Sequence, residues 1–167
     1  MGRPLRGSGL ARAPQGDGDR MHKQRFGRDD KGRSDVTLLD KINAMKMPFA
    51  ELKGVTFIEA EPDRVVARML VRPDLCTLGH TIHGGAVMAF ADSVGAAATV
   101  INLPPDAKGT TTIESKTNFV GGAKEGTTVT AIATPVHRGR RTQVWQTRIE
   151  GEEGKLVAIV TQTQMVL

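Results

Sequence analysis

Cysteine and aromatic residues are scarce in this chain of 167 residues. It contains one cysteine (Cys76), one tryptophan and no tyrosine, and aromatic residues make up 4% of the sequence. A single cysteine excludes an intrachain disulfide framework and fits a reducing compartment, so we expect a cytoplasmic protein. The lack of tyrosine excludes a tyrosine acid or base. No run of 18 apolar residues occurs, so we expect no membrane partner.

Motifs of several common enzyme classes are also missing. The sequence has no Gly-x-Ser-x-Gly elbow of a serine hydrolase and no phosphate-binding loop or dinucleotide-binding motif. Cys76, His80, His83 and His137 invite a metal interpretation, but their spacing matches no usual zinc pattern and no second thiolate exists. We therefore expect neither a metal nor a bound cofactor.

The positive charge is confined to one end of the chain. Residues 1–34 contain nine Lys or Arg against four Asp, which accounts for the whole formal charge of +5. This segment is rich in glycine and has few large apolar side chains, so we predict a disordered basic tail at 1–33 and one domain at 34–167. Because acidic and basic residues balance in the domain, we expect no nucleic-acid partner.

The domain begins with a helical pattern and then changes between strand and helix patterns. Ser34 or Asp35 can cap a short helix that ends near Pro48. A hairpin follows with its turn at Pro62, and an irregular stretch leads to a long segment of small and apolar residues at 86–101 that favours a buried helix. The predicted strands cover residues 55–60, 64–71, 110–120, 127–136, 142–150 and 156–167. This order predicts an α+β domain with one central helix on an antiparallel sheet of five or six strands.

The sharpest local feature is His83-Gly84-Gly85 at the start of the long helix. Backbone N–H groups at a helix start lack partners within the helix, and glycines let a ligand approach them. Such a site can bind an anion or polarise a carbonyl oxygen. The alternative is a tight turn that needs glycine for its backbone conformation.

Asp92 is the second unusual residue, because it interrupts an apolar run in the same helix. A carboxylate there carries a desolvation cost unless it is hydrogen-bonded, paired or functional. The alternatives are a general base or nucleophile and a satisfied structural carboxylate. Asp92 lies roughly 12 Å beyond Gly84 at 1.5 Å per residue, so the two residues of one chain cannot grip the same small group. A symmetric dimer could bring Asp92 of one subunit to Gly84 of the other.

The combination of these features resembles the hotdog-fold acyl-CoA thioesterases, in particular the phenylacetate-degradation (PaaI-type) branch. The resemblance covers about Ser34 to Leu167. It rests on His-Gly-Gly followed after six residues by Asp, on the order of the elements, and on further motifs: Thr110-Thr111-Thr112-Ile113-Glu114, Asn118-Phe119, Gly139-Arg140 and the turn from Gly154 to Ala158.

The resemblance implies a role for each matching position. The Gly84 N–H would polarise the thioester carbonyl, and His83 would position the thioester or its loop. Asp92 of the partner subunit would act as nucleophile or activate water, helped by Thr112 or, one position earlier, Thr111. Coenzyme A would lie across the interface of a homodimer or a tetramer of two dimers.

We expect Gly85 to bind the substrate, together with residues of two loops: the arginine-rich turn at 138–141 and the segment of Thr77 and His80. The cluster Arg138, Arg140 and Arg141 is either a clamp for coenzyme A phosphates or a solvated charged turn. The sequence departs from the family pattern at Thr77, where the family often has an amide residue, and at His80, where it often has glycine. Either residue could replace the missing amide.

Together these features predict a thioester hydrolase that converts acyl-CoA to a free acid and coenzyme A. The alternatives are an enoyl-CoA hydratase of the same fold, in which Asp usually precedes His, and a non-catalytic acyl-CoA sensor or accessory protein.

Overall fold

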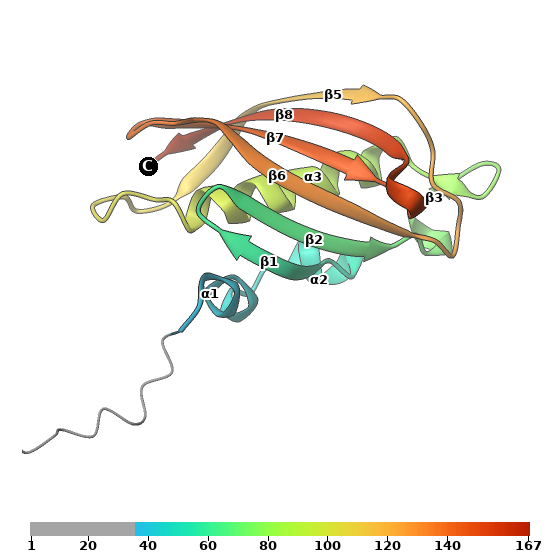
Figure 1. Cartoon of the computed structure of the whole chain (residues 1–167), viewed down its shortest axis with the longest axis horizontal. Helices are drawn as coiled ribbons and strands as arrows, with labels where there is room; N and C mark the ends of the chain where they lie inside the picture. Colours follow the sequence, from blue (N-terminus) through green and yellow to red (C-terminus); the bar gives the residue numbers. More distant parts are fainter. Residues whose placement is uncertain (1–35) are drawn as a thin grey trace, which may run out of the picture. The chain divides into compact units, whose positions relative to one another are not determined.

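The computed structural model describes residues 36–167, so the predicted tail at 1–33 lies outside the described residues. Six antiparallel strands form one sheet in the order β1-β2-β6-β7-β8-β5, and helix α3 lies across its concave face (Figure 1). The helices are α1 (Leu38–Ala44), α2 (Pro48–Lys53) and α3 (Gly84–Val100), and the strands are β1 (Thr56–Glu61), β2 (Arg64–Leu70), β3 (Cys76–Thr77), β4 (Thr81–Ile82), β5 (Thr110–Phe119), β6 (Thr128–Arg138), β7 (Thr142–Glu150) and β8 (Leu156–Val166). No helix in this range is long and apolar enough to cross a membrane.

The start of the domain differs from the prediction. The cap of α1 is Thr37, not Ser34 or Asp35, because the Thr37 hydroxyl accepts from the Asp40 N–H while the Asp40 carboxylate accepts from the Thr37 N–H. Pro48 does not end this helix but begins α2, which the sequence analysis missed. Proline suits the first helical position because no intrahelical acceptor exists there for the N–H it lacks. Gly54 ends α2 in the left-handed conformation, with φ 75°.

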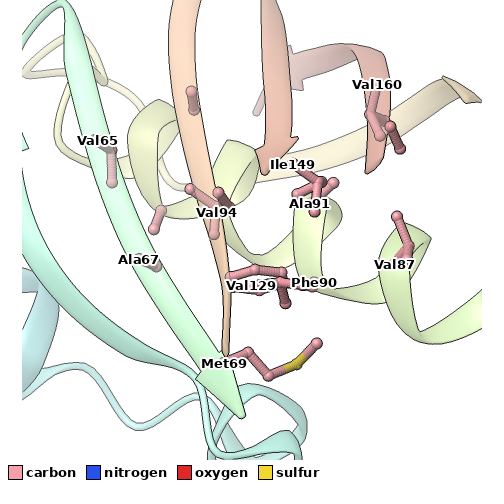
Figure 2. Packing of buried hydrophobic residues seen from close by; sticks show 14 of the residues in the cluster. Val65, Ala67, Met69, Val87, Phe90, Ala91, Val94, Val129, Ile149 and Val160 are labelled. Carbon is pink, nitrogen blue, oxygen red and sulfur yellow. The ribbon is translucent and has the colours of Figure 1, made fainter. Parts of the chain in front are cut away.

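Helix α3 is buried on the side that faces the sheet, as its composition predicts, but Gly85, Met88 and Val100 on its other sides are exposed. Phe90, Ala91 and Val94 are completely buried where the helix faces the sheet. They contact apolar side chains of the central strands, among them Val129 and Ile149 (Figure 2). Burial of such side chains stabilises the fold by about 1.5–3 kcal/mol for each large one. The packing therefore fixes both the depth and the rotation of α3, and with them the direction in which its polar residues point.

The predicted antiparallel sheet of five or six strands is confirmed with six strands, and the strand ends shift by a few residues. The stretch expected to be irregular contains a small hairpin of β3 and β4, whose Cys76 pairs with Ile82 immediately before α3. Strand β5 pairs with β8 on one side only and forms an edge of the sheet. A bulge between Thr112 and Glu114 interrupts its register.

Candidate active site

The start of α3 is shaped by His83, which is the N-cap residue. Its Nδ1 accepts a hydrogen bond of 2.8 Å from the Gly85 N–H, and its carbonyl accepts from Ala86 and Val87. The Gly84 N–H, in contrast, has no acceptor within residues 36–167. The helix therefore begins with one free donor at the positive end of its dipole. Of the two glycines, only Gly84 offers its N–H to a ligand, because Gly85 already donates to His83.

Gly84 lies against Phe119, at the end of β5. A Cβ at position 84 would come 3.2 Å from the Phe119 ring. Glycine is therefore favoured by close packing as well as by ligand access, and the interpretations of the motif as a tight packing site and as a donor site are compatible.

Asp92 is held by two side chains from the sheet. The Thr112 hydroxyl of β5 and the Gln162 Nε2 of β8 each donate to the same carboxylate oxygen, Oδ1, at 2.8 Å. The other oxygen, Oδ2, has no hydrogen-bond partner within the described part of the chain. This arrangement fixes the orientation of the carboxylate and leaves one oxygen open. It also shows which of the two predicted threonines of β5 lies at the site. Thr112 contacts Asp92, whereas Thr111 is exposed.

A row of buried polar side chains behind Asp92 was missed by the sequence analysis. Gln164 donates from Nε2 to the Thr112 hydroxyl at 2.7 Å, and the Thr110 hydroxyl donates to Gln164 Oε1 at 3.2 Å. Gln162 and Gln164 are both completely buried. Their alternate positions in β8, on the same face as the core residue Val160, were the available signal. The Thr112 hydroxyl donates to Asp92 while it accepts from Gln164, so the network points its proton toward the carboxylate.

Gly95 makes room for this network in α3. A Cβ at position 95 would overlap the amide of Gln162, so only glycine lets this side chain reach Asp92. The Oε1 atom of Gln162 is buried with no hydrogen-bond partner within residues 36–167. A buried acceptor without a partner costs about 1–3 kcal/mol. The chain thus carries an energetic cost in order to place an N–H donor on Asp92.

This cost makes Gln162→Met an informative substitution. Methionine has a similar length, but it lacks both the N–H that holds Asp92 and the oxygen that has no partner. We expect kcat to fall about tenfold or more, because a charge-assisted hydrogen bond is lost, while the melting temperature stays the same or rises. Steady-state kinetics and thermal unfolding measured on one preparation test this. A loss of stability that accompanies unchanged kcat would show that Gln162 is only a packing residue.

A cavity of about 430 Å³ lies between α2 and the first turns of α3. His83, Gly85 and Ala86 line its α3 side, and Lys53 of α2 lines the opposite side. The Lys53 side chain is almost fully buried. Burial lowers the pKa of Lys53, and the nearby Asp92 carboxylate opposes this shift. A cavity therefore leads from the start of the long helix to a buried cation.

Thr77 and His80, two predicted substrate-binding residues, lie in the β3–β4 hairpin and are exposed. His80 adopts a φ of 55°, which is unusual for a residue other than glycine, and its Nδ1 lies 2.7 Å from the Glu125 carboxylate. Neither side chain lines the cavity, whereas the neighbouring Cys76 does.

The predicted basic cluster lies beyond the other end of α3. Arg138 donates to the Pro62 carbonyl and to the side chain of Asn102, and Arg140 forms an ion pair of 2.7 Å with Asp106. The Arg141 side chain forms no hydrogen bond or ion pair with any residue that the structure describes. Arg138 and Arg140 thus connect the β6–β7 turn to the loop after α3.

The described residues contain no group of three or more His, Cys, Asp or Glu side chains placed to hold a metal ion. This result covers the four side chains considered from the sequence, Cys76, His80, His83 and His137. The donor set considered from the sequence is therefore not brought together by the fold.

Comparisons with known proteins identify the family to which the chain belongs. A family model described as the Thioesterase superfamily matches residues 79–158, which include the motif, Asp92 and Thr112. The solved structure of a thioesterase variant from Pseudomonas aeruginosa superposes with a TM-score of 0.71 at 30% identity, over 77% of this chain and 93% of that chain. The chain belongs to the thioesterase superfamily. The hotdog fold expected from the resemblance is confirmed.

Two further relatives show which thioesterases the chain is similar to. A variant of the phenylacetic acid degradation protein PaaI from Thermus thermophilus is 31% identical, with a TM-score of 0.66, and is covered over its whole length by 72% of this chain. A 1,4-dihydroxy-2-naphthoyl-CoA hydrolase from Escherichia coli is 35% identical over 86 residues, which is 52% of this chain and 62% of the relative. The protein described here is therefore a thioester hydrolase. Its sequence and fold are similar to those of PaaI proteins.

Proposed function

We propose that this thioesterase hydrolyses acyl-CoA thioesters in a site shared by two subunits. The observation that carries this proposal is the open Oδ2 of Asp92, held by Thr112 and Gln162 on the same helix that begins with the free Gly84 N–H. A carboxylate with one anchored and one open oxygen suits a general base or nucleophile. A free N–H at a helix start suits an oxyanion.

The spacing along α3 explains why two subunits are needed. Gly84, Met88 and Asp92 follow each other at intervals of four residues and lie on one face of the helix. Two antiparallel copies of α3 that cross at Met88 would place Gly84 of each copy opposite Asp92 of the other. This two-fold arrangement closes as a dimer and creates two equivalent sites.

The exposed surface beside α3 supports such a pairing. Met88 is 39% exposed in the first half of α3, between Gly84 and Asp92. Ile113 and Phe119 are 55% and 53% exposed on β5, whose outer edge has no strand partner in the described chain. Exposed apolar side chains next to an open strand edge favour association with a second copy.

In the proposed reaction, the Gly84 N–H of one subunit donates to the thioester carbonyl oxygen and stabilises the negative charge that develops there. Asp92 Oδ2 of the partner takes a proton from water, and the hydroxide forms a bond to the carbonyl carbon. The C–S bond then breaks, coenzyme A leaves as the thiolate and takes up the proton held by Asp92, and the acid remains. Alternatively, the carboxylate attacks the carbonyl carbon directly, loss of the coenzyme A thiolate leaves a mixed anhydride, and water cleaves this anhydride to release the acid and restore the carboxylate. Thr112 acts here by holding Asp92.

The same antiparallel pairing would bring the remaining predicted binding residues to the shared site. The basic loop with Arg138, Arg140 and Arg141 lies beside the C-terminal end of α3, which the pairing brings toward the His83–Gly84 end of the partner. We propose that the phosphates of coenzyme A bind there, with Arg141 as the first contact because Arg138 and Arg140 already have partners. Thr77 and His80 would contact coenzyme A or the partner from the exposed hairpin.

Release of free thiol from a panel of acyl-CoAs, with short, long and aromatic acyl groups, tests the proposal. We expect turnover of at least one class by the wild-type protein. Binding of acyl-CoA without turnover of any member would contradict hydrolysis and would instead support an acyl-CoA sensor.

A further inference from the structure

We propose that Lys53 makes this thioesterase selective for acyl groups that carry an oxygen acceptor at their far end. The inference rests on the proposed function, since it assigns a role to the cavity that begins at His83. The acceptor is a hydroxyl or a carboxylate oxygen, and the thioester end of the same substrate lies at Gly84.

The first argument is the burial of a charged side chain. Lys53 is 3% exposed, and no carboxylate within the described residues forms an ion pair with its Nζ atom. Lysine is rarely buried without such a pair. An apolar side chain would pack against α3 without this desolvation cost, so packing alone does not explain a lysine at this position.

The second argument is the set of contacts that the ammonium group makes. Nζ donates to the Ala89 carbonyl at 2.9 Å and to the Ser93 hydroxyl at 3.0 Å. It also lies 3.8 Å from the centroid of the Phe49 ring. An ammonium group has three N–H donors, so oxygen atoms satisfy two of them and the third has only a ring face, which is a weaker partner. Phe49 is 59% exposed and lines the same cavity, so its ring can move aside for a ligand.

The third argument is the position of Lys53 relative to the free N–H. Its contacts at Ala89 and Ser93 lie five and nine residues beyond Gly84, which is roughly 8–13 Å along the helix axis. The cavity is lined by His83 and Gly85, on either side of Gly84, and continues past Ala86 and Ala89 to Lys53. An acyl group whose carbonyl lies at Gly84 therefore reaches the ammonium group with its sixth or seventh atom. An oxygen there would accept a charge-assisted hydrogen bond, whereas a methyl group would leave the cation without one.

The experiment compares matched substrates that differ only at the far end. One set is hexanoyl-CoA, 6-hydroxyhexanoyl-CoA and the mono-CoA thioester of hexanedioic acid, and the second is phenylacetyl-CoA with its 4-hydroxy form. We expect kcat/KM of the full-length wild-type protein to favour an oxygen-bearing member by about tenfold or more. The hydroxyl and carboxylate members separate a neutral acceptor from an anion.

Variants of Lys53 then test the residue itself through the ratio of kcat/KM values. Lys53→Met is expected to reduce the preference at least about tenfold. Lys53→Gln, which keeps a donor without charge, is expected to keep a preference for the hydroxyl but not for the carboxylate. Lys41→Met on the exposed surface of α1 is the control and is expected to leave the ratio unchanged.

Equal kcat/KM values of the wild-type protein for the matched substrates would overturn the inference while hydrolysis itself stands. The same holds if Lys53→Met lowers kcat/KM equally for every member of a set. Absence of turnover for both sets and for the broader panel would overturn the proposed function and this inference together.

Discussion

Asp92→Asn is expected to lower kcat by about 10²–10⁴-fold, the range that a positioned acid–base group contributes. The substitution is nearly isosteric. The asparagine Oδ1 can still accept from Thr112 and Gln162, so the two hydrogen bonds of 2.8 Å can persist and the fold should be retained. What is lost is the open oxygen, since an NH₂ group takes the place of Oδ2 and can neither take a proton from water nor attack the thioester.

The measurement is single-turnover hydrolysis of the best substrate from the panel, with thermal unfolding recorded on the same samples. Asp63→Asn in the exposed β1–β2 turn is a control that changes the net charge equally. Turnover by Asp92→Asn within about threefold of wild type would remove Asp92 from the reaction, because even a minor acid–base role contributes more than this.

Gly84→Pro is expected to lower kcat by about 10²–10³-fold, the loss that follows removal of one oxyanion donor. Proline deletes the N–H that has no acceptor within residues 36–167. The helix should tolerate it because Gly84 is the first helical residue, where proline is favoured. His83 also has the extended backbone that a residue before proline prefers, with φ −71° and ψ 138°. The Gly85 N–H can still donate to His83.

Gly84→Ala is the matched comparison for this substitution. Both variants add a Cβ that meets the Phe119 ring at 3.2 Å, so they share this contact. Alanine keeps the N–H. If the donor matters, kcat of the proline variant falls far below that of the alanine variant, whereas equal losses would assign the whole effect to contact with Phe119.

The arrangement of the main helix and strands was largely predictable from local sequence patterns. The small and apolar residues of α3 and the β-branched alternation of the last four strands indicated a buried helix on an antiparallel sheet, because burial and period depend on the side chains themselves. Helix α2 escaped prediction since it has only six residues and begins with Pro48, which sequence analysis interprets more readily as an end. The Thr37 cap was missed because Ser34 and Asp35 offered equally good capping side chains nearby.

The candidate site was predictable in part, and the limit is physical. His83, Gly84 and Asp92 lie on one helix, so their spacing could be derived from the helical rise alone. Thr112 required the register of β5 to within one residue, and the bulge after it makes such a register hard to derive. Gln162, Gly95 and Lys53 come together only through the packing of α3 against β8 and α2. Contacts of this kind depend on the rotation of the helix, which no local pattern specifies.

Complementation between two inactive variants tests the shared site most directly. Asp92→Asn and Gly84→Pro are each purified, then mixed, unfolded and refolded together. If Gly84 of one subunit works with Asp92 of its partner, half of the randomly formed dimers are mixed and each contains one intact site, so activity should return to about a quarter of the wild-type value. If both residues work within one chain, every site in the mixture is defective. Activity that stays at the level of the separate variants would contradict a site built from two subunits.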